Sequence, residues 1–189
     1  MRVIAVLAAL VVSCFAQDLH PGSTVPGFVA NDPAGKIIHL GEFQGHVTVV
    51  AFISTTCPIS NAFNDRLSAL YRDYSAKGIQ FIILNANANE LPSAVAEHAK
   101  SAGFPFPVMK DAGNQAADLF GAMATPETYV IDSKGILRYH GYIDDSVNEA
   151  RVKNRGLRSA IDAVLAGKPV AQPETKAFGC TIKRVRRTS

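Results

Sequence analysis

The fold is decided by the stretch Val47-Thr-Val-Val-Ala-Phe-Ile-Ser-Thr-Thr-Cys57-Pro58-Ile-Ser60-Asn-Ala-Phe63. Residues 47–53 are apolar or β-branched, a run typical of a central strand that is covered on both faces. Small hydroxyl residues then lead to one cysteine, and the proline after it suits the first turn of a helix. The stretch therefore predicts a buried strand that delivers the Cys57 thiol to the start of a helix.

The residues after Cys57 have the periodicity of one amphipathic helix, which ends at Lys77-Gly78. Its apolar positions recur mostly three and four residues apart, at Ile59, Phe63, Leu67, Leu70, Tyr71 and Tyr74. A second apolar run follows at 79–84. Strand, helix and strand in succession form a βαβ unit, so we expect the two strands to be parallel.

The rest of the chain contributes shorter elements and a tail. We predict helices at 93–102, 114–120 and 153–166, an extended segment at 104–108, and strands at 37–40, 129–131 and 136–139. The last two strands flank the turn Asp132-Ser-Lys-Gly135 and should form an antiparallel hairpin. Residues 18–33 are interpreted as an irregular lead-in, and residues 168–189 as a polar, mobile tail.

The N-terminus has the pattern of an export signal, predicted at residues 1–16. Arg2 precedes an apolar run that is too short to span a bilayer. Cleavage after Ala16 would give a secreted or periplasmic protein. In the alternative, Val11-Val12-Ser13-Cys14 resembles a lipoprotein box, and a lipidated Cys14 would anchor the mature protein to a membrane.

Length and composition fit one globular domain, expected at 17–170, with a C-terminal tail at 171–189. The chain has 189 residues, of which 48% are hydrophobic, and this is ample for one core. The net charge of +3 is modest, and basic residues gather at the end of the chain, at Lys183, Arg184, Arg186 and Arg187. A solvated tail explains that cluster, so we expect no nucleic-acid partner.

Two cysteines remain after signal removal, Cys57 and Cys180, in a compartment where disulfides persist. Pro58 at the first helical position would make Cys57 the N-cap residue, with its sulfur near unpaired amides. The helix dipole favours an anion there by about 0.3–1 kcal/mol, so we expect a moderate lowering of the Cys57 pKa. The alternative, a buried thiol without chemistry, fits poorly with neighbours such as Thr55 and Thr56.

Seven short motifs, in the order in which they occur along the chain, indicate a protein family. They are Cys57-Pro58, Asn64-Asp65-Arg66-Leu67, Lys77-Gly78-Ile79, Ala124-Thr-Pro126-Glu, Tyr142-Ile-Asp144-Asp145, Leu165-Ala-Gly-Lys168 and Gly179-Cys180-Thr-Ile-Lys183. In this order they resemble the redoxin branch of the thioredoxin fold. Within that branch the chain is similar to the peroxiredoxin-like family, related to alkyl hydroperoxide reductase and thiol-specific antioxidant, that ends in Gly-Cys-x-Ile-Lys. The resemblance implies an α/β fold, a thioredoxin-like three-layer α/β/α sandwich with a central mixed β-sheet.

The resemblance also implies an exported thiol oxidoreductase with Cys57 as its nucleophile, in thiol-disulfide exchange or peroxide reduction. Thr125 and Pro126 would lie opposite Cys57, where the backbone before the proline pairs with an extended substrate. The residues expected to support the thiol are its neighbours Thr56, Pro58 and Ser60. Partners would be protein or small-molecule thiols and disulfides, or peroxide, with an external thiol reductant. No cofactor and no metal are expected.

The chain departs from the pattern of its relatives around the thiol. Ser60 stands where many relatives have a second cysteine, and Ala51 stands where thioredoxins have a buried acid. Ser54 fits the hydroxyl residue three positions before a peroxidatic cysteine, but Thr125-Pro126 stands where the partner arginine is expected. A complete peroxide-activating site is therefore not expected.

Ser60 excludes a local dithiol, so a mixed disulfide at Cys57 needs another thiol to resolve it. The candidates are Cys180, an external thiol and the substrate itself. Cys180 as a structural or merely free thiol is an equally weighted alternative. For the whole protein, the alternatives are a catalytically weak thioredoxin-fold binding module and a copper-handling protein that uses Cys57 and His140.

Overall fold

The structure is a computed structural model that describes residues 19–41 and 45–186. The predicted signal peptide at 1–16, with Cys14 and both cleavage sites, lies outside the described residues, as does Arg187. Within the described part, no helix has the length and apolar character that a membrane span requires.

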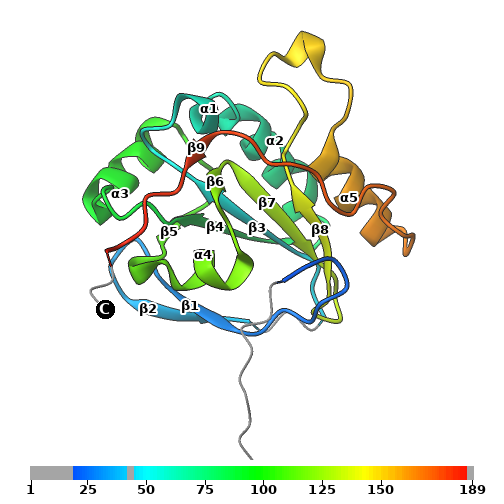
Figure 1. Cartoon of the computed structure of the whole chain (residues 1–189), viewed down its shortest axis with the longest axis horizontal. Helices are drawn as coiled ribbons and strands as arrows, with labels where there is room; N and C mark the ends of the chain where they lie inside the picture. Colours follow the sequence, from blue (N-terminus) through cyan, green and yellow to red (C-terminus); the bar gives the residue numbers. More distant parts are fainter. Residues whose placement is uncertain (1–18, 42–44, 187–189) are drawn as a thin grey trace, which may run out of the picture.

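A mixed seven-stranded sheet forms the centre of the described structure (Figure 1). Its strands are β1 (Phe28–Asn31), β2 (Ile37–Leu40), β3 (Thr48–Ile53), β4 (Gln80–Asn85), β5 (Val108–Lys110), β7 (Glu127–Ile131) and β8 (Leu137–Gly141), in the order β2-β1-β5-β4-β3-β7-β8. β3, β4 and β5 run parallel, while β7 is antiparallel to β3 and to β8. Every residue of β3 is buried, as its continuous apolar sequence predicts.

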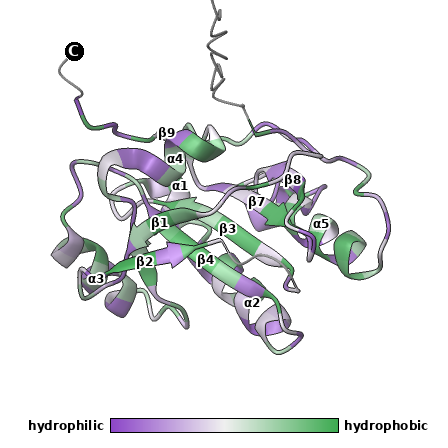
Figure 2. Ribbon diagram, turned by 90° about the horizontal axis from the view of Figure 1, so that it is seen from below, coloured by the Kyte–Doolittle hydropathy of each residue, from purple (hydrophilic) through white to green (hydrophobic). Residues whose placement is uncertain are grey.

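Helices cover both faces of the sheet and complete the three-layer α/β/α sandwich that the resemblance predicted. They are α1 (Pro58–Asn61), α2 (Asn64–Ser75), α3 (Pro92–Ser101), α4 (Gln115–Phe120) and α5 (Gly156–Leu165), with the 3-10 turns η1 (Ala112–Asn114) and η2 (Glu149–Arg151). One hydrophobic cluster joins the sheet to α2, α3 and α5, and another joins its opposite face to α4. Figure 2 shows hydrophobic ribbon concentrated in β3 and β4, between these layers.

Three elements near the sheet differ from the prediction. The expected irregular lead-in contains β1, which pairs with β2, and the extended segment after Phe104 continues into β5. The single helix expected after Cys57 is divided into α1 and α2. The N–H of Phe63 donates to the carbonyl of Ser60, three residues back, and this bond tightens the chain into a turn between the two helices. Phe63 thereby enters the core.

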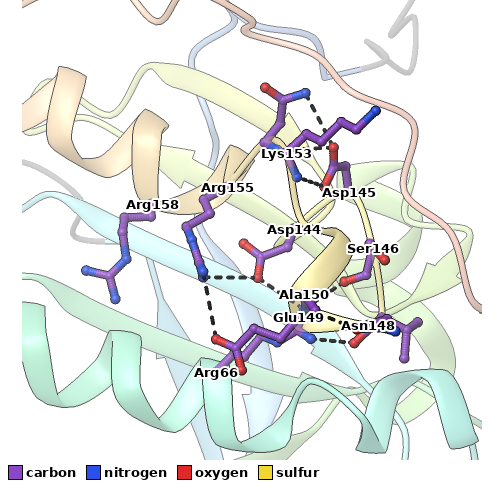
Figure 3. A network of polar contacts seen from close by, with 12 residues as sticks. Arg66, Asp144, Asp145, Ser146, Asn148, Glu149, Ala150, Lys153, Arg155 and Arg158 are labelled. Carbon is purple, nitrogen blue, oxygen red and sulfur yellow. Dashed lines mark hydrogen bonds and ion pairs between the residues drawn. The ribbon is translucent and has the colours of Figure 1, made fainter.

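The loop between β8 and α5 is fixed to α2 by Arg66 (Figure 3). The Arg66 guanidinium donates to the carboxylate of Asp144 at 3.1 Å, to the carbonyl of Ser146 at 2.7 Å and to the carbonyl of Val147. Burial raises the pKa of Asp144, and the positive charge of Arg66 opposes that effect. Two of the sequence motifs, around positions 66 and 144, are therefore one structural unit.

The last helix begins at Gly156 rather than at the predicted position 153. The carboxylate of Asp145 accepts the N–H groups of Lys153 at 3.0 Å and Asn154 at 3.1 Å (Figure 3). These amides are satisfied in the loop, so the helix starts after them. The apolar stripe predicted for this helix is buried at Leu157, Ala160 and Ile161.

The C-terminal tail is docked on the domain, which differs from the predicted mobile tail, although most of its described residues are exposed as a solvated tail would be. In Figure 1 the tail crosses the molecule as the red segment and forms β9 (Cys180–Thr181), which pairs with β6 (Ala124–Thr125). The side chain of Ile182 is buried, and the N–H of Lys183 donates to Oδ1 of Asn87 at 2.8 Å. The docking contacts are largely made by backbone groups, which sequence patterns do not reveal.

Candidate active site

Cys57 is the N-cap residue of α1 and is separated from the end of β3 by the loop residues Ser54, Thr55 and Thr56. Its backbone is extended, with φ −83° and ψ 115°, and Pro58 occupies the first turn as predicted. The N–H of Ser60 donates to Sγ of Cys57 at 3.3 Å. α1 spans only four residues, so the long helix expected to begin at Cys57 is absent, and the N–H of Ser60 is the backbone donor that points at its sulfur.

Cys57 forms a disulfide with Cys180. Their Cα atoms are 5.9 Å apart, although the two residues are 123 positions apart in sequence. Cys57 is buried, whereas Cys180 is partly exposed. Of the three roles that the sequence left open for Cys180, the disulfide excludes a free thiol in this oxidised form.

The Thr125–Pro126 peptide bond is cis and lies against the disulfide. The carbonyl oxygen of Thr125 is 3.4 Å from Sγ of Cys57, a van der Waals contact because a disulfide sulfur carries no proton. On the other side, the hydroxyl of Thr125 donates to the carbonyl of Cys180 at 3.4 Å. The structure thus brings Cys57, Cys180, Thr125 and Pro126 to one point.

Sequence reasoning missed a buried carboxylate, Glu90, that holds the loop before Cys57. Its oxygens accept the Ser54 hydroxyl at 2.6 Å, the Thr55 N–H at 2.9 Å and the Thr56 hydroxyl at 2.8 Å. Burial raises the pKa of Glu90, but these and further hydrogen bonds outweigh burial and lower it to about 2. Glu90 is therefore ionised at neutral pH, and it orders three consecutive residues of the loop.

Ser54 connects Glu90 to Cys57. Its hydroxyl donates to Glu90 and accepts the N–H of Cys57 at 3.1 Å. The hydroxyl of Ser60 accepts the N–H of Ser54 at 3.0 Å, so the residue at the position of the second cysteine closes the same loop. The proton of the Ser54 hydroxyl is committed to Glu90, which differs from the expectation that Ser54 serves a peroxidatic cysteine.

A sequence signal for Glu90 exists in the polar run Asn85-Ala-Asn-Ala-Asn-Glu90. This run begins where β4 ends, and β3 and β4 are parallel neighbours. Residues that follow two such strands meet at the same edge of the sheet. Ala51, at the position of the acid of thioredoxins, is buried among apolar residues, and the acid beside the thiol loop comes from position 90 instead.

A second buried carboxylate, Glu127, fixes β6 next to the cis peptide bond. It accepts the N–H groups of Met123 and Ala124, both at 2.8 Å, and its Oε1 lies 2.5 Å from Nε2 of His140. Burial raises the pKa of Glu127, but His140 and the two amides produce a net lowering. His140, a candidate copper ligand in the sequence, is thus engaged by Glu127. The described residues include no group of three or more His, Cys, Asp or Glu side chains that could hold a metal ion.

Comparison with known proteins gives the family. Residues 21–140 match the model of the AhpC/TSA family. The chain belongs to this family. Its relatives include the thiol-disulfide oxidoreductase ResA of Bacillus thuringiensis subsp. konkukian, which is 31% identical over 119 residues, 63% of this chain and 68% of the relative. The ResA protein of Halalkalibacterium halodurans is 30% identical over 131 residues, 68% of this chain and 73% of the relative. The expected redoxin family is confirmed.

Solved structures are similar to this AhpC/TSA protein over a larger share of its length than the ResA relatives are. A hypothetical protein, SMc02350 from Sinorhizobium meliloti 1021, is 33% identical with a TM-score of 0.80, over 89% of this chain and 97% of its own. An uncharacterized conserved protein from Geobacillus kaustophilus is 29% identical with a TM-score of 0.81, over 89% and 94%. A putative thioredoxin from Neisseria meningitidis is 25% identical with a TM-score of 0.62, over 77% and 91%.

Proposed function

We propose that this AhpC/TSA protein is a thiol-disulfide oxidoreductase in which Cys57 is the nucleophile and Cys180 the resolving thiol. The observation that carries the proposal is the Cys57–Cys180 disulfide beside the cis Thr125–Pro126 peptide bond. The relatives named thiol-disulfide oxidoreductase ResA support the same class of reaction.

The proposed reaction consists of two thiol-disulfide exchanges. The thiolate of Cys57 attacks one sulfur of a substrate disulfide and forms a mixed disulfide, and the other substrate sulfur leaves as a thiolate with the bonding electron pair. The thiolate of Cys180 then attacks Sγ of Cys57 and releases the second substrate thiolate. The substrate has gained two electrons, and the Cys57–Cys180 disulfide remains. An external dithiol of the reductant class reduces this disulfide and restores both thiols.

The docked tail supports Cys180 as the resolving thiol. β9 pairs with β6, and the contacts of Ile182 and Lys183 hold the chain just after Cys180. Cys180 is thereby kept beside Cys57 at a high effective concentration, so resolution is intramolecular. In the proposed site, Thr56 ties the loop to Glu90, while Pro58 and Ser60 shape the turn that presents the sulfur.

Disulfide exchange is favoured over peroxide reduction by the surroundings of Cys57. The Ser54 hydroxyl donates to Glu90, and the nearest arginine in sequence, Arg66, is committed to Asp144. A peroxidatic thiolate would need such groups to bind and polarise the peroxide. We therefore expect this AhpC/TSA protein to reduce disulfides much faster than peroxide.

Export of the protein through the segment at 1–16 is part of the proposal. The support is the signal pattern of that segment and a disulfide, which persists in oxidising compartments. The intact mass of the protein purified from its native cells tests this. A mature chain that starts at Gln17, or one with a lipid on Cys14, agrees with export, and a chain that retains Met1 contradicts it.

Reduction of insulin by full-length variants, with a dithiol as reductant, tests the catalytic roles. Cys57→Ser is expected to lose the activity. Reduced Cys180→Ser, freed of the dithiol and then mixed with insulin, is expected to form a mixed disulfide that persists, because neither the intramolecular thiol nor an external one is present to resolve it. Thr181→Ala is the matched control, since the side chain of Thr181 is exposed and only its backbone pairs with β6. Equal rates for Cys57→Ser and the control would instead favour a thioredoxin-fold binding module.

A further inference from the structure

Residues 178–182, named the strap from here on, lie across the Cys57 site as an extended peptide. Cys180 and Thr181 pair antiparallel with Thr125 and Ala124. The N–H of Ile182 donates to the carbonyl of Met123 at 2.9 Å, which continues the pairing. The strap therefore occupies the backbone edge that precedes the cis proline, where the sequence predicts that an extended substrate pairs (Figure 1).

Gly179, directly before the cysteine of the strap, sits where no side chain fits. A Cβ atom built on Gly179 would be 1.9 Å from the carbonyl oxygen of Thr125 and 2.7 Å from its carbonyl carbon. Both are backbone atoms of a peptide bond held by its neighbours, so they cannot move aside. The φ of Gly179 is +150°, which L side chains also disfavour. A peptide bound in this register needs glycine before its cysteine.

Ile182, two residues after the cysteine, fills an apolar site. Its side chain is 3% exposed and belongs to the hydrophobic cluster that contains Phe120 and Ala122, whereas Thr181 is exposed. Alternate residues of an extended strand point to the same side, so Cys180 and Ile182 both face the domain. A bound peptide thus gains affinity from an aliphatic residue two positions after its cysteine, while the residue between them is free to vary.

The residue before the glycine makes a weaker contact. The ring of Phe178 is half-buried and packs edge-on against Phe63, with centroids 6.0 Å apart, and lies 6.5 Å from the ring of Tyr142. An aromatic side chain is accepted here but remains partly in solvent. The requirement for glycine and the aliphatic site are therefore the stronger determinants of the sequence that binds.

We propose that the strap is an internal copy of the substrate, and that the protein acts on extended polypeptide segments of the pattern Gly-Cys-x-aliphatic. This inference rests on the proposed function, because it assigns a substrate class to the same Cys57 site. The reaction is the exchange described above, with the attacked sulfur on the cysteine of that segment. A substrate must displace the strap from β6, so the docked strap limits the rate at which substrates enter. The tethered strap must then dock again before Cys180 can resolve the mixed disulfide.

The test uses full-length Cys180→Ser protein and peptides whose cysteine carries a thionitrobenzoate leaving group. Attack by Cys57 on the cysteinyl sulfur forms the protein–peptide disulfide and releases coloured thionitrobenzoate, whose absorbance gives the rate. The peptide Phe-Gly-Cys-Thr-Ile-Lys is compared with its alanine analogue Phe-Ala-Cys-Thr-Ile-Lys. We expect the glycine peptide to react at least about tenfold faster, which corresponds to about 1.4 kcal/mol.

A second variant tests displacement of the strap. In Gly179→Ala combined with Cys180→Ser, the new methyl group weakens strap docking, so both peptides should react several-fold faster with the same preference for glycine. Equal rates for the two peptides, or no acceleration in the double variant, would overturn the inference. The symmetrical thionitrobenzoate disulfide, which needs no peptide register, reports Cys57 reactivity alone. If Cys57 reacts with this disulfide but shows no preference between the peptides, the proposed function stands and only the inference fails. If Cys57 reacts with no disulfide at all, the proposed function and the inference are both overturned.

Discussion

At the scale of residues, the site depends on two buried carboxylates that face different backbones. Glu90 holds the hydroxyl and amide groups of the loop that ends at Cys57, and Glu127 holds the amides at the start of β6, those of Met123 and Ala124. Each carboxylate is stabilised by donors that would be left unpaired without it. The disulfide therefore lies between the loop before Cys57 and β6, and a buried carboxylate holds each of these two segments in place.

Replacing Glu90 with Gln should lower stability at neutral pH and flatten its pH dependence in acid. The pKa of Glu90 falls from an ordinary value of 4.5 to about 2 in the folded protein. The stabilisation is complete above pH 4.5 and is lost as the pH falls toward about 2, because the protonated form cannot accept all of its bonds. The difference corresponds to about 3 kcal/mol.

Urea unfolding of wild type and Glu90→Gln between neutral pH and acid checks this. The exposed Glu97→Gln on α3 is the matched control and should follow wild type. Identical pH profiles for Glu90→Gln and wild type would contradict the role of Glu90.

The residues around the thiol were partly predictable from sequence. The types and order of four residues predict that they belong to a thiol site, and the structure brings them together: Cys57, Pro58, Thr125 and Pro126. Glu90 was missed because the polar run that contains it does not show that the hydroxyl and amide groups it holds, at 54–56, lie more than thirty positions away. The parallel pairing of β3 and β4 explains the contact, and the sequence implied that pairing without giving its register.

At the scale of elements, the loop between β8 and α5 is held by a buried ion pair, and its rupture should be costly. The side chains of Arg66 and Asp144 are 13% and 5% exposed. Arg66→Met would leave a buried carboxylate and two carbonyls without their donor, so we expect a loss of roughly 3 kcal/mol in the free energy of unfolding.

Arg155→Met is the matched control for this prediction (Figure 3). Arg155 reaches the same Asp144 at 3.7 Å, but its side chain is 47% exposed. Its removal should cost less than about 1 kcal/mol. Urea unfolding measures both variants, and equal losses would show that burial of the pair is not what holds the loop.

Continuous or strongly periodic elements were predictable, and elements defined by distant partners were not. The βαβ unit and the hairpin at Asp132-Ser-Lys-Gly135 follow from apolar runs and turn residues. β1 is short and lies in a stretch rich in turn residues, so only its pairing with β2 reveals it. The break between α1 and α2 preserves the helical spacing of apolar residues, which is why periodicity alone did not find it.

At the scale of the molecule, the disulfide closes most of the chain into one loop. It joins residues 123 positions apart, and loop-closure entropy predicts a stabilisation of about 3–5 kcal/mol. Reduction of the wild type should therefore lower the thermal midpoint by roughly 10 °C. Cys180→Ser should match the reduced wild type in a calorimetric scan, with or without reductant. A reduced protein that melts at the temperature of the oxidised one would contradict this.

The family and the overall architecture could be predicted because motifs from most of the domain occur in order. The docking of the tail could not, because its pairing with β6 is made by backbone atoms and leaves no periodic pattern. That docking changes the interpretation of Cys180. Its neighbours in the tail hold it beside Cys57, and this supports the proposal that Cys57 and Cys180 act as one redox pair without a local dithiol motif.

The central claim is that Cys57 and Cys180 exchange between thiols and a mutual disulfide during turnover. The most direct measurement is peptide mapping by mass spectrometry under non-reducing conditions, after fully reduced wild type has reacted once with a stoichiometric substrate disulfide. We predict one Cys57–Cys180 linkage for each substrate disulfide consumed. Full consumption of the substrate with Cys180 still alkylatable as a free thiol would contradict the account.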